Sequence, residues 1–283
     1  MTAVCRLASH AATGLAAALI LTWGSAITVP AQTHSGAEPQ ATADPLAVIA
    51  DTLRASYADH LIGYDNGQLI WRDGSRSPLD DGRGVKPFAT WLAEPDIEDM
   101  LQRPYRSGAL TSPPAADDDP GRARNAHFFD KMYGNCSKGE VAAKLVDVVW
   151  LPHKYGGKLK VTRINGVAER LAAVSRALDA LPASFDRFLI PPAGTYVCRT
   201  IAGTTRSSAH GYGIAIDIAT RESNYWRWPR TGSGAKEWRN KIPQEIVAIF
   251  EAHGFIWGGK WHHFDTMHFE YRPELLSPTA KVE

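Results

Sequence analysis

A histidine and an aspartate seven positions apart form the first group of side chains that could bind a metal ion. Both lie in the segment 208–218, which reads SAHGYGIAIDI. We expect a strand over Gly213–Ala219, in which side chains alternate between two faces and the three isoleucines face the core. Only glycine and alanine would then share the face of Asp217, which leaves room beside its carboxylate for an ion and a substrate. The glycines would let the chain bring His210 back toward this carboxylate.

A third candidate ligand lies near the C-terminus, in the segment 261–271, which reads WHHFDTMHFEY. We expect a strand over Met267–Tyr271, with His268 on the face opposite the apolar side chains. If this strand pairs with the strand that carries Asp217, the three side chains can meet. Zinc binds imidazole nitrogen and carboxylate oxygen, and a catalytic zinc site commonly has three protein ligands and one position for water. We therefore predict one zinc ion per chain, held by His210, Asp217 and His268.

An additional carboxylate lies three positions before the second histidine. Asp265 sits in an expected turn, from which it could reach the reacting water without being a ligand. A carboxylate so placed takes the proton as water attacks and returns it to the leaving amine, while zinc polarises the scissile carbonyl. A single histidine or aspartate is ordinarily a structural residue. The combination of the spaced ligands with Asp265 predicts a hydrolase.

These residues resemble the D-alanyl-D-alanine carboxypeptidase-like zinc peptidases, which include vancomycin-resistance carboxypeptidases and phage L-alanyl-D-glutamate endolysins. The family motif S-x-H-x-x-G-x-A-x-D is matched in full by residues 208–217, and its later D-x-x-H motif by residues 265–268. The resemblance covers roughly residues 195–275, with looser similarity back to about 135. It implies that the three predicted ligands bind zinc and that Asp265 is the general base.

The resemblance also implies a substrate, which is the stem peptide of bacterial peptidoglycan. Many carboxypeptidase members have glutamate where this chain has Asp265, whereas endolysins typically have aspartate, so an endopeptidase is slightly favoured. A family arginine holds the substrate carbonyl or carboxylate. Arg199 is its candidate counterpart here, although its spacing to His210 is shorter than expected and a surface role is the alternative. Further candidate substrate contacts are Ser208, Tyr212 and His263.

Two other functions fit parts of the sequence. Ser233 and Lys236 match the S-x-x-K element of serine-dependent cell-wall carboxypeptidases, but the accompanying S-x-N and K-T-G elements are missing. A zinc-stabilised binding module without turnover is the second alternative, because the signalling domain of hedgehog proteins resembles this family in its metal site. A purely structural zinc ion has no need of a free base beside it. Asp265 therefore favours catalysis.

The first residues predict export. Arg6 precedes an apolar run over about residues 11–27, and Val29-Pro30-Ala31 resembles the cleavage site of a secretory signal peptide. A polar segment over residues 32–44 follows, which favours a cleaved signal and a linker over an uncleaved membrane anchor. We expect a signal peptide over residues 1–31 and a periplasmic or extracellular location.

Two cysteines remain after removal of this signal, because Cys5 lies within it. In an oxidising compartment Cys136 and Cys198 could form a disulfide, and two buried free thiols are the alternative. Neither belongs to a C-x-x-C pair, which argues against a zinc site of two cysteines and two histidines.

Composition narrows the choice of partners. The 283 residues are 44% apolar and carry 31 basic and 30 acidic side chains, for a formal charge of +1. This balance gives no electrostatic footprint for nucleic acid or for an anionic membrane surface. We therefore expect no nucleic acid partner and, after signal removal, no membrane partner.

Hydrophobic periodicity and turn residues predict an α+β fold, with a small antiparallel sheet and flanking helices. An N-terminal accessory region over residues 45–130 would precede a catalytic domain over residues 131–276 and a tail over residues 277–283. The expected helices cover residues 45–57, 166–181 and 244–253, and further strands are expected over residues 61–64, 68–71, 145–151, 158–163 and 196–200.

Overall fold

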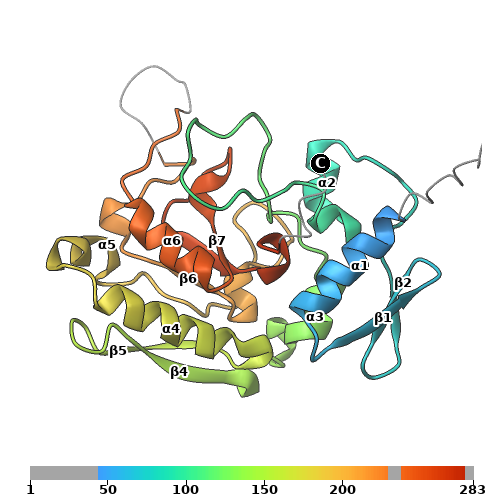
Figure 1. The fold of residues 1–283 in the computed structure, drawn as a ribbon, viewed down its shortest axis with the longest axis horizontal. Helices are drawn as coiled ribbons and strands as arrows, with labels where there is room; N and C mark the ends of the chain where they lie inside the picture. Colours follow the sequence, from blue (N-terminus) through green and yellow to red (C-terminus); the bar gives the residue numbers. More distant parts are fainter. Residues whose placement is uncertain (1–43, 229–236, 278–283) are drawn as a thin grey trace, which may run out of the picture. The chain divides into compact units, whose positions relative to one another are not determined.

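The computed structural model describes residues 44–228 and 237–277. Figure 1 shows the elements of this part of the chain, coloured in the order of the sequence. The predicted signal peptide, almost all of the predicted linker and the Ser233–Lys236 pair lie outside the described residues. None of the helices within the described ranges is long and apolar enough to cross a membrane.

The N-terminal part is a helix packed on a small antiparallel sheet. Helix α1 (Pro45–Ser56) begins at Asp44, whose carboxylate accepts a hydrogen bond of 3.0 Å from the backbone of Leu46. The strands that follow are β1 (Leu61–Asp65), β2 (Gln68–Trp71) and β3 (Arg76–Pro78), in that order in the sheet. Asn66 and Gly67 form the β1–β2 turn with positive φ, as a tight hairpin requires. The helix and the first two strands agree with the sequence prediction.

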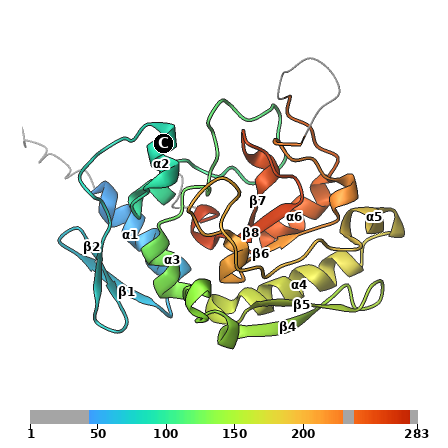
Figure 2. The same cartoon turned by 180° about the vertical axis from the view of Figure 1, so that it is seen from behind.

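The next layer consists of a β-hairpin and the helix that follows it. Strands β4 (Leu145–Trp150) and β5 (Gly157–Thr162) pair antiparallel, and α4 (Val167–Asp179) lies between this hairpin and α6 (Gln244–Ala252), as Figures 1 and 2 show. The short helix α5 (Asp186–Leu189) comes after α4. The predicted apolar stripe of α4 is buried at Val167, Leu171, Val174 and Leu178.

Three short strands form the sheet that carries the candidate site. Strands β6 (Ala215–Asp217), β8 (His268–Tyr271) and β7 (Phe255–Trp257) pair in that order, all antiparallel. Helix α6 packs against them through Phe250, whose ring stacks on Phe269 with centroids 3.8 Å apart. The mixture of helices and small antiparallel sheets confirms the predicted α+β class.

Two strand predictions need correction. Residues 196–200 form a loop with a single bridge, Thr200 to Ser207, rather than a strand. The strand expected over residues 213–219 is only three residues long, because Gly213 adopts a φ of 70° at the end of a 3-10 turn. A Cβ atom at Gly213 would lie 2.9 Å from Leu145 and 3.0 Å from the backbone nitrogen of Thr162, so glycine also permits a close approach to β4 and β5.

Helix α3 (Ala126–Tyr133) joins the N-terminal part to the rest of the protein, and α2 (Phe88–Ala93) precedes it. The ring of Phe128 packs against Tyr57 and Trp71, with centroids 5.6 and 5.4 Å away. The ring of Phe129 packs against Tyr212 on the other side, at 5.5 Å. The predicted boundary at residue 130 thus falls inside a helix, and one hydrophobic cluster includes residues from both sides of it. A division of roles between the two regions stays a prediction.

We predict that Phe128→Ala lowers the free energy of unfolding by about 3–5 kcal/mol, because it opens a cavity in this shared cluster. The unfolding of the whole chain should shift as one transition in denaturant, followed by tryptophan fluorescence and by far-ultraviolet circular dichroism. Val85→Ala, at a side chain that is 86% exposed, is the control and should shift it little. Two transitions, of which only one moves, would contradict a shared core.

Candidate metal centre

Strand register brings the three predicted ligands together. Asp217 is the last residue of β6 and His268 the first of β8, and the antiparallel pairing places these two residues opposite each other. His210 lies in the 3-10 turn Ala209–Tyr212, which Ser208 caps by accepting a hydrogen bond from the backbone of His210. The pairing of the two ligand-bearing strands agrees with the sequence prediction.

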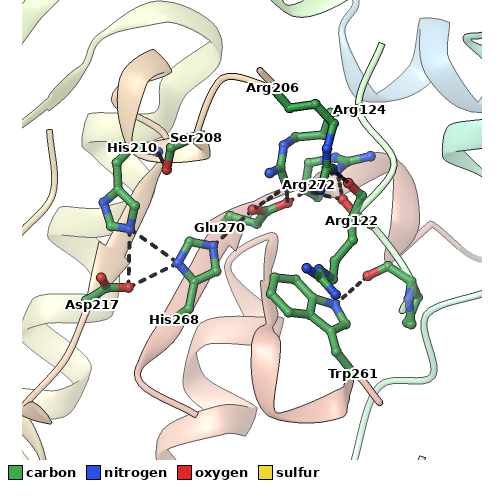
Figure 3. Close-up of polar contacts among 12 residues, drawn as sticks. Arg122, Arg124, Arg206, Ser208, His210, Asp217, Trp261, His268, Glu270 and Arg272 are labelled. Carbon is green, nitrogen blue, oxygen red and sulfur yellow. Dashed lines mark hydrogen bonds and ion pairs between the residues drawn. The ribbon is translucent and has the colours of Figure 1, made fainter. Parts of the chain in front are cut away.

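The atoms that face one another have the spacing of zinc ligands (Figure 3). Nε2 of His210 lies 3.2 Å from Oδ1 of Asp217, and Nδ1 of His268 lies 3.0 Å from the same oxygen. The two ring nitrogens are 3.3 Å apart. Ligand atoms about 2.0 Å from a tetrahedral zinc ion are separated by about 3.3 Å, so the spacing and the donor set both fit zinc.

Each histidine is oriented through its other ring nitrogen. Nδ1 of His210 donates to the carbonyl oxygen of Thr195, and Nε2 of His268 donates to Oε2 of Glu270 over 3.0 Å. Both partners accept hydrogen bonds, so each imidazole presents an unprotonated nitrogen to its neighbours when it is neutral. This is the arrangement by which proteins fix the tautomer and the ring orientation of metal-binding histidines.

Charge is concentrated among the candidate ligands. Burial opposes ionisation of Asp217, but hydrogen bonds from His210 and His268 outweigh it and hold the pKa of Asp217 well below its usual range. Burial likewise opposes a charged His268, yet the hydrogen bonds to Asp217 and Glu270 raise the pKa of His268 to about 10. The group therefore attracts a cation, which is either a proton on His268 or a metal ion.

Glu270 is a candidate functional residue that the sequence analysis did not identify. Its carboxylate is fully buried and accepts from His268, from Arg124 at 3.0 Å and from Arg272 at 3.2 Å. Arg272 in turn donates to Glu274, which accepts from the hydroxyl of Tyr57, the residue directly after α1. The only signal in the sequence was that Glu270 would share the strand face of His268. Of the two arginines that keep it ionised, Arg124 is far from Glu270 in the sequence and Arg272 lies just beyond the end of β8.

The three ligands open onto a pocket of about 100 Å³, which Asp265 also lines. Oδ1 of Asp265 is buried and has no hydrogen-bond partner among the described residues. Burial raises the pKa of Asp265 to about 6, and the nearby charge of Asp217 acts in the same direction while the two histidines oppose it. A buried acceptor without a protein partner, beside three ligands, is the arrangement that a proton-accepting group for a bound water would have.

The other predicted site residues differ in their placement. Ser208 and His263 line the pocket, and His263 donates from Nδ1 to Oδ2 of Asp119 over 2.7 Å. Burial lowers the pKa of His263, so its ring is neutral with Nε2 unprotonated. Arg199 is exposed at the pocket, and within the described part of the chain its side chain donates only to the carbonyl oxygen of Thr200. Sequence reasoning did not identify Arg122 and Arg124, which line the same pocket.

Tyr212, the remaining predicted substrate contact, lies elsewhere. Its ring is buried against Phe129 and Tyr133, and its hydroxyl donates to Asp130 over 3.0 Å. The tight 3-10 turn directs successive side chains to different sides, so His210 faces Asp217 and His268 while Tyr212 faces α3. Tyr212 thus packs against the core and lines a neighbouring cavity, but it does not line the pocket of the candidate ligands.

Cys136 and Cys198 are joined by a disulfide, with Cα atoms 5.6 Å apart. The bridge lies against the turn that carries His210, because a Cβ atom at Gly211 would lie 3.2 Å from the sulfur of Cys136. It therefore ties the loop around Arg199 to the region after α3. This is the disulfide that the sequence analysis considered, because only these two cysteines remain after removal of the predicted signal peptide.

Residues 202–271 match the family model described as D-alanyl-D-alanine carboxypeptidase. The matched segment contains the three candidate ligands and Asp265, begins after Arg199, and covers less than half of the chain. It supports the family that the two motifs indicated, and hence a peptidase, without separating the carboxypeptidase and endolysin branches. Comparisons with curated proteins and with solved structures found no match.

We predict that Glu270→Gln weakens zinc binding by about 10- to 100-fold, because the neutral amide holds His268 less firmly and makes its ring a poorer ligand. Competition with a chromophoric chelator would measure the affinity. Glu251→Gln is the matched control, since Glu251 is also a buried carboxylate but pairs with Lys260 and Tyr105 instead. Both variants should lose stability, and equal zinc affinities in the two would contradict the role given to Glu270.

Proposed function

We propose that this chain is an exported, zinc-dependent peptidase that hydrolyses peptide bonds in the stem peptides of bacterial peptidoglycan. One observation carries the proposal: three side chains with zinc-ligand spacing lie beside the unpartnered carboxylate oxygen of Asp265. The family match over residues 202–271 supports the same activity. Peptidoglycan is the proposed partner, and the proposed location is the periplasm or the extracellular space.

The residues of the pocket have separate roles in this proposal. His210 Nε2, Asp217 Oδ1 and His268 Nδ1 would hold the zinc ion. When bound, zinc would supply Lewis acidity, which polarises a carbonyl group and lowers the pKa of water toward 7. Asp265 would accept the proton of the attacking water through its unpartnered oxygen and pass that proton to the leaving amine. Burial that raises its pKa to about 6 suits both halves of this transfer.

Further residues would position the substrate. His263 is neutral and held by Asp119, so its Nε2 can accept a hydrogen bond from a substrate amide. Arg199 has donors free of carboxylate partners among the described residues and lies at the exposed side of the pocket, where it could hold a substrate carbonyl or carboxylate. The aspartate at position 265 favours the endopeptidase branch slightly.

We predict that Asp265→Asn keeps one zinc ion per chain and lowers kcat by about 10²- to 10⁴-fold, because the amide cannot accept the proton. The zinc content of the variant would be measured by elemental mass spectrometry. Its turnover on purified peptidoglycan would be measured on the same sample. Asp179→Asn is the control, at a carboxylate bound to His153 on another part of the protein. Full turnover by Asp265→Asn would remove this residue from the mechanism, and a zinc-loaded wild type without turnover would favour the binding-module alternative.

We also predict that removal of zinc by a chelator abolishes hydrolysis and that added zinc restores it in the wild type. His210→Ala should stay inactive after the same addition, because two ligands hold the ion too weakly. Mass spectrometry of defined muropeptide products would reveal the bond that is cut. Loss of a terminal alanine means a carboxypeptidase, whereas separation of the first two stem residues means an endopeptidase. Undiminished activity without metal would contradict the proposal.

A further inference from the structure

A second, larger cavity lies next to the metal pocket. Its volume is about 350 Å³, and Arg124 lines both spaces. Arg206 lines the second cavity and not the metal pocket. Residues of α3 also line the second cavity, as do residues 205 and 207, which precede the turn that carries His210. The size suits one or two residues of a peptide whose reacting part occupies the metal pocket.

Arg206 carries a charge that forms no ion pair with any described residue. Three neighbouring guanidinium groups have carboxylate partners, because Arg122 pairs with Asp119, Arg124 with Glu270, and Arg272 with both Glu270 and Glu274. Within residues 44–228 and 237–277, no carboxylate pairs with Arg206. Figure 3 shows Arg206 beside Arg124 on the side of Glu270 away from His210.

The donors of Arg206 remain available to a ligand. Its one side-chain hydrogen bond runs from Nη1 to the carbonyl oxygen of Arg122, over 3.2 Å. The Nε and Nη2 atoms have no partner in the described protein, and neither is among the buried side-chain atoms without a partner. These N–H groups therefore keep some exposure at a residue that lines the cavity, and they could form the parallel pair of hydrogen bonds that a carboxylate accepts.

The surroundings make an unpaired cation at this position unfavourable. Burial lowers the pKa of Arg206 to about 10, and the charges of Arg124 and Arg122 act in the same direction. A half-buried charge without a partner destabilises the free protein, and a bound anion would remove that cost. The arrangement is therefore that of a site which is completed by its ligand.

Acidic residues of the same cavity do not fill this role. Asp130 accepts from the hydroxyl of Tyr212 and from the side-chain amide of Asn135. Glu94 pairs with Arg83. Both carboxylates have partners of their own, so neither supplies a counterion to Arg206.

We propose that Arg206, assisted by Arg124, binds a carboxylate of an acidic peptide substrate at a position outside the scissile bond. This rests on the proposed peptidase function, because it places the reacting part of the same peptide in the metal pocket. A carboxylate is preferred over other anions since its planar pair of oxygens matches the guanidinium fork. The protein would thus select stem peptides by a free carboxyl group in addition to the bond that it cuts.

The test compares synthetic stem peptides that differ only in one carboxyl group outside the scissile bond, present as the free acid or as the carboxamide. The wild type should cleave one of the free-acid peptides with a KM about 10- to 100-fold lower than that of its carboxamide, the range expected for a charged hydrogen bond. In Arg206→Gln this difference should vanish with kcat nearly unchanged, and Arg206→Lys should restore part of it. Equal KM values for every acid and amide pair in the wild type would overturn the subsite.

Arg163→Gln is the matched control. Arg163 also donates one hydrogen bond of 3.2 Å to a backbone carbonyl oxygen and lies outside both cavities, so its variant should keep the preference of the wild type. Binding of the same peptides to zinc-loaded Asp265→Asn, measured by calorimetry, separates the subsite from catalysis. Acid-selective binding without hydrolysis by the wild type would contradict the proposed peptidase function and support the subsite. Hydrolysis without acid selectivity would contradict the subsite alone.

Discussion

The register between β6 and β8 is the constraint on which the candidate site depends. It places Asp217 opposite His268, and the turn before β6 then brings His210 to the same point. A shift of one residue would turn His268 and Glu270 to the opposite face of the sheet, since neighbouring side chains on a strand point in opposite directions. The stacking of Phe250 on Phe269 from the opposite face opposes such a shift. Packing of the core and geometry of the ligands are therefore set by the same strand pairing.

A chain of buried charges continues from this sheet to the N-terminal helix. His268 donates to Glu270, and Glu270 pairs with two arginines. One of these, Arg272, pairs with Glu274, which accepts a hydrogen bond from the hydroxyl of Tyr57 at the end of α1. Buried ion pairs contribute little net stability, because desolvation opposes their attraction. Their effect here is positional: they keep an ionised acceptor behind a candidate metal ligand without exposure to water. The N-terminal part thereby contacts the site through packing and through charge, although none of His210, Asp217 and His268 lies in it.

Arginine is unevenly distributed around the centre. Arg122, Arg124 and Arg206 come from two loops and gather between the metal pocket and the adjoining cavity. Two of them neutralise carboxylates that hold His263 and His268, while the third has its charge uncompensated among the described residues. Arginine therefore neutralises buried carboxylates in one place, and in another Arg206 is proposed to bind an anion. The charges close to the candidate metal centre therefore say more about what this region can bind than the nearly neutral net charge of the whole chain does.

The sequence by itself determined the local elements and the identity of the candidate ligands. Hydrophobic periodicity, a cap and a tight turn are properties of neighbouring residues, so α1, the first hairpin, α4 and α6 could be located without a structure. The spaced His210, Asp217, Asp265 and His268 could be recognised because their types and spacing are unusual for a structural role. Only the tertiary structure decided that Tyr212 faces the core, that residues 196–200 form no strand, and that Glu270 and the arginines surround the site. Those features depend on contacts between residues far apart in the chain, and such contacts leave no periodic signal in the sequence.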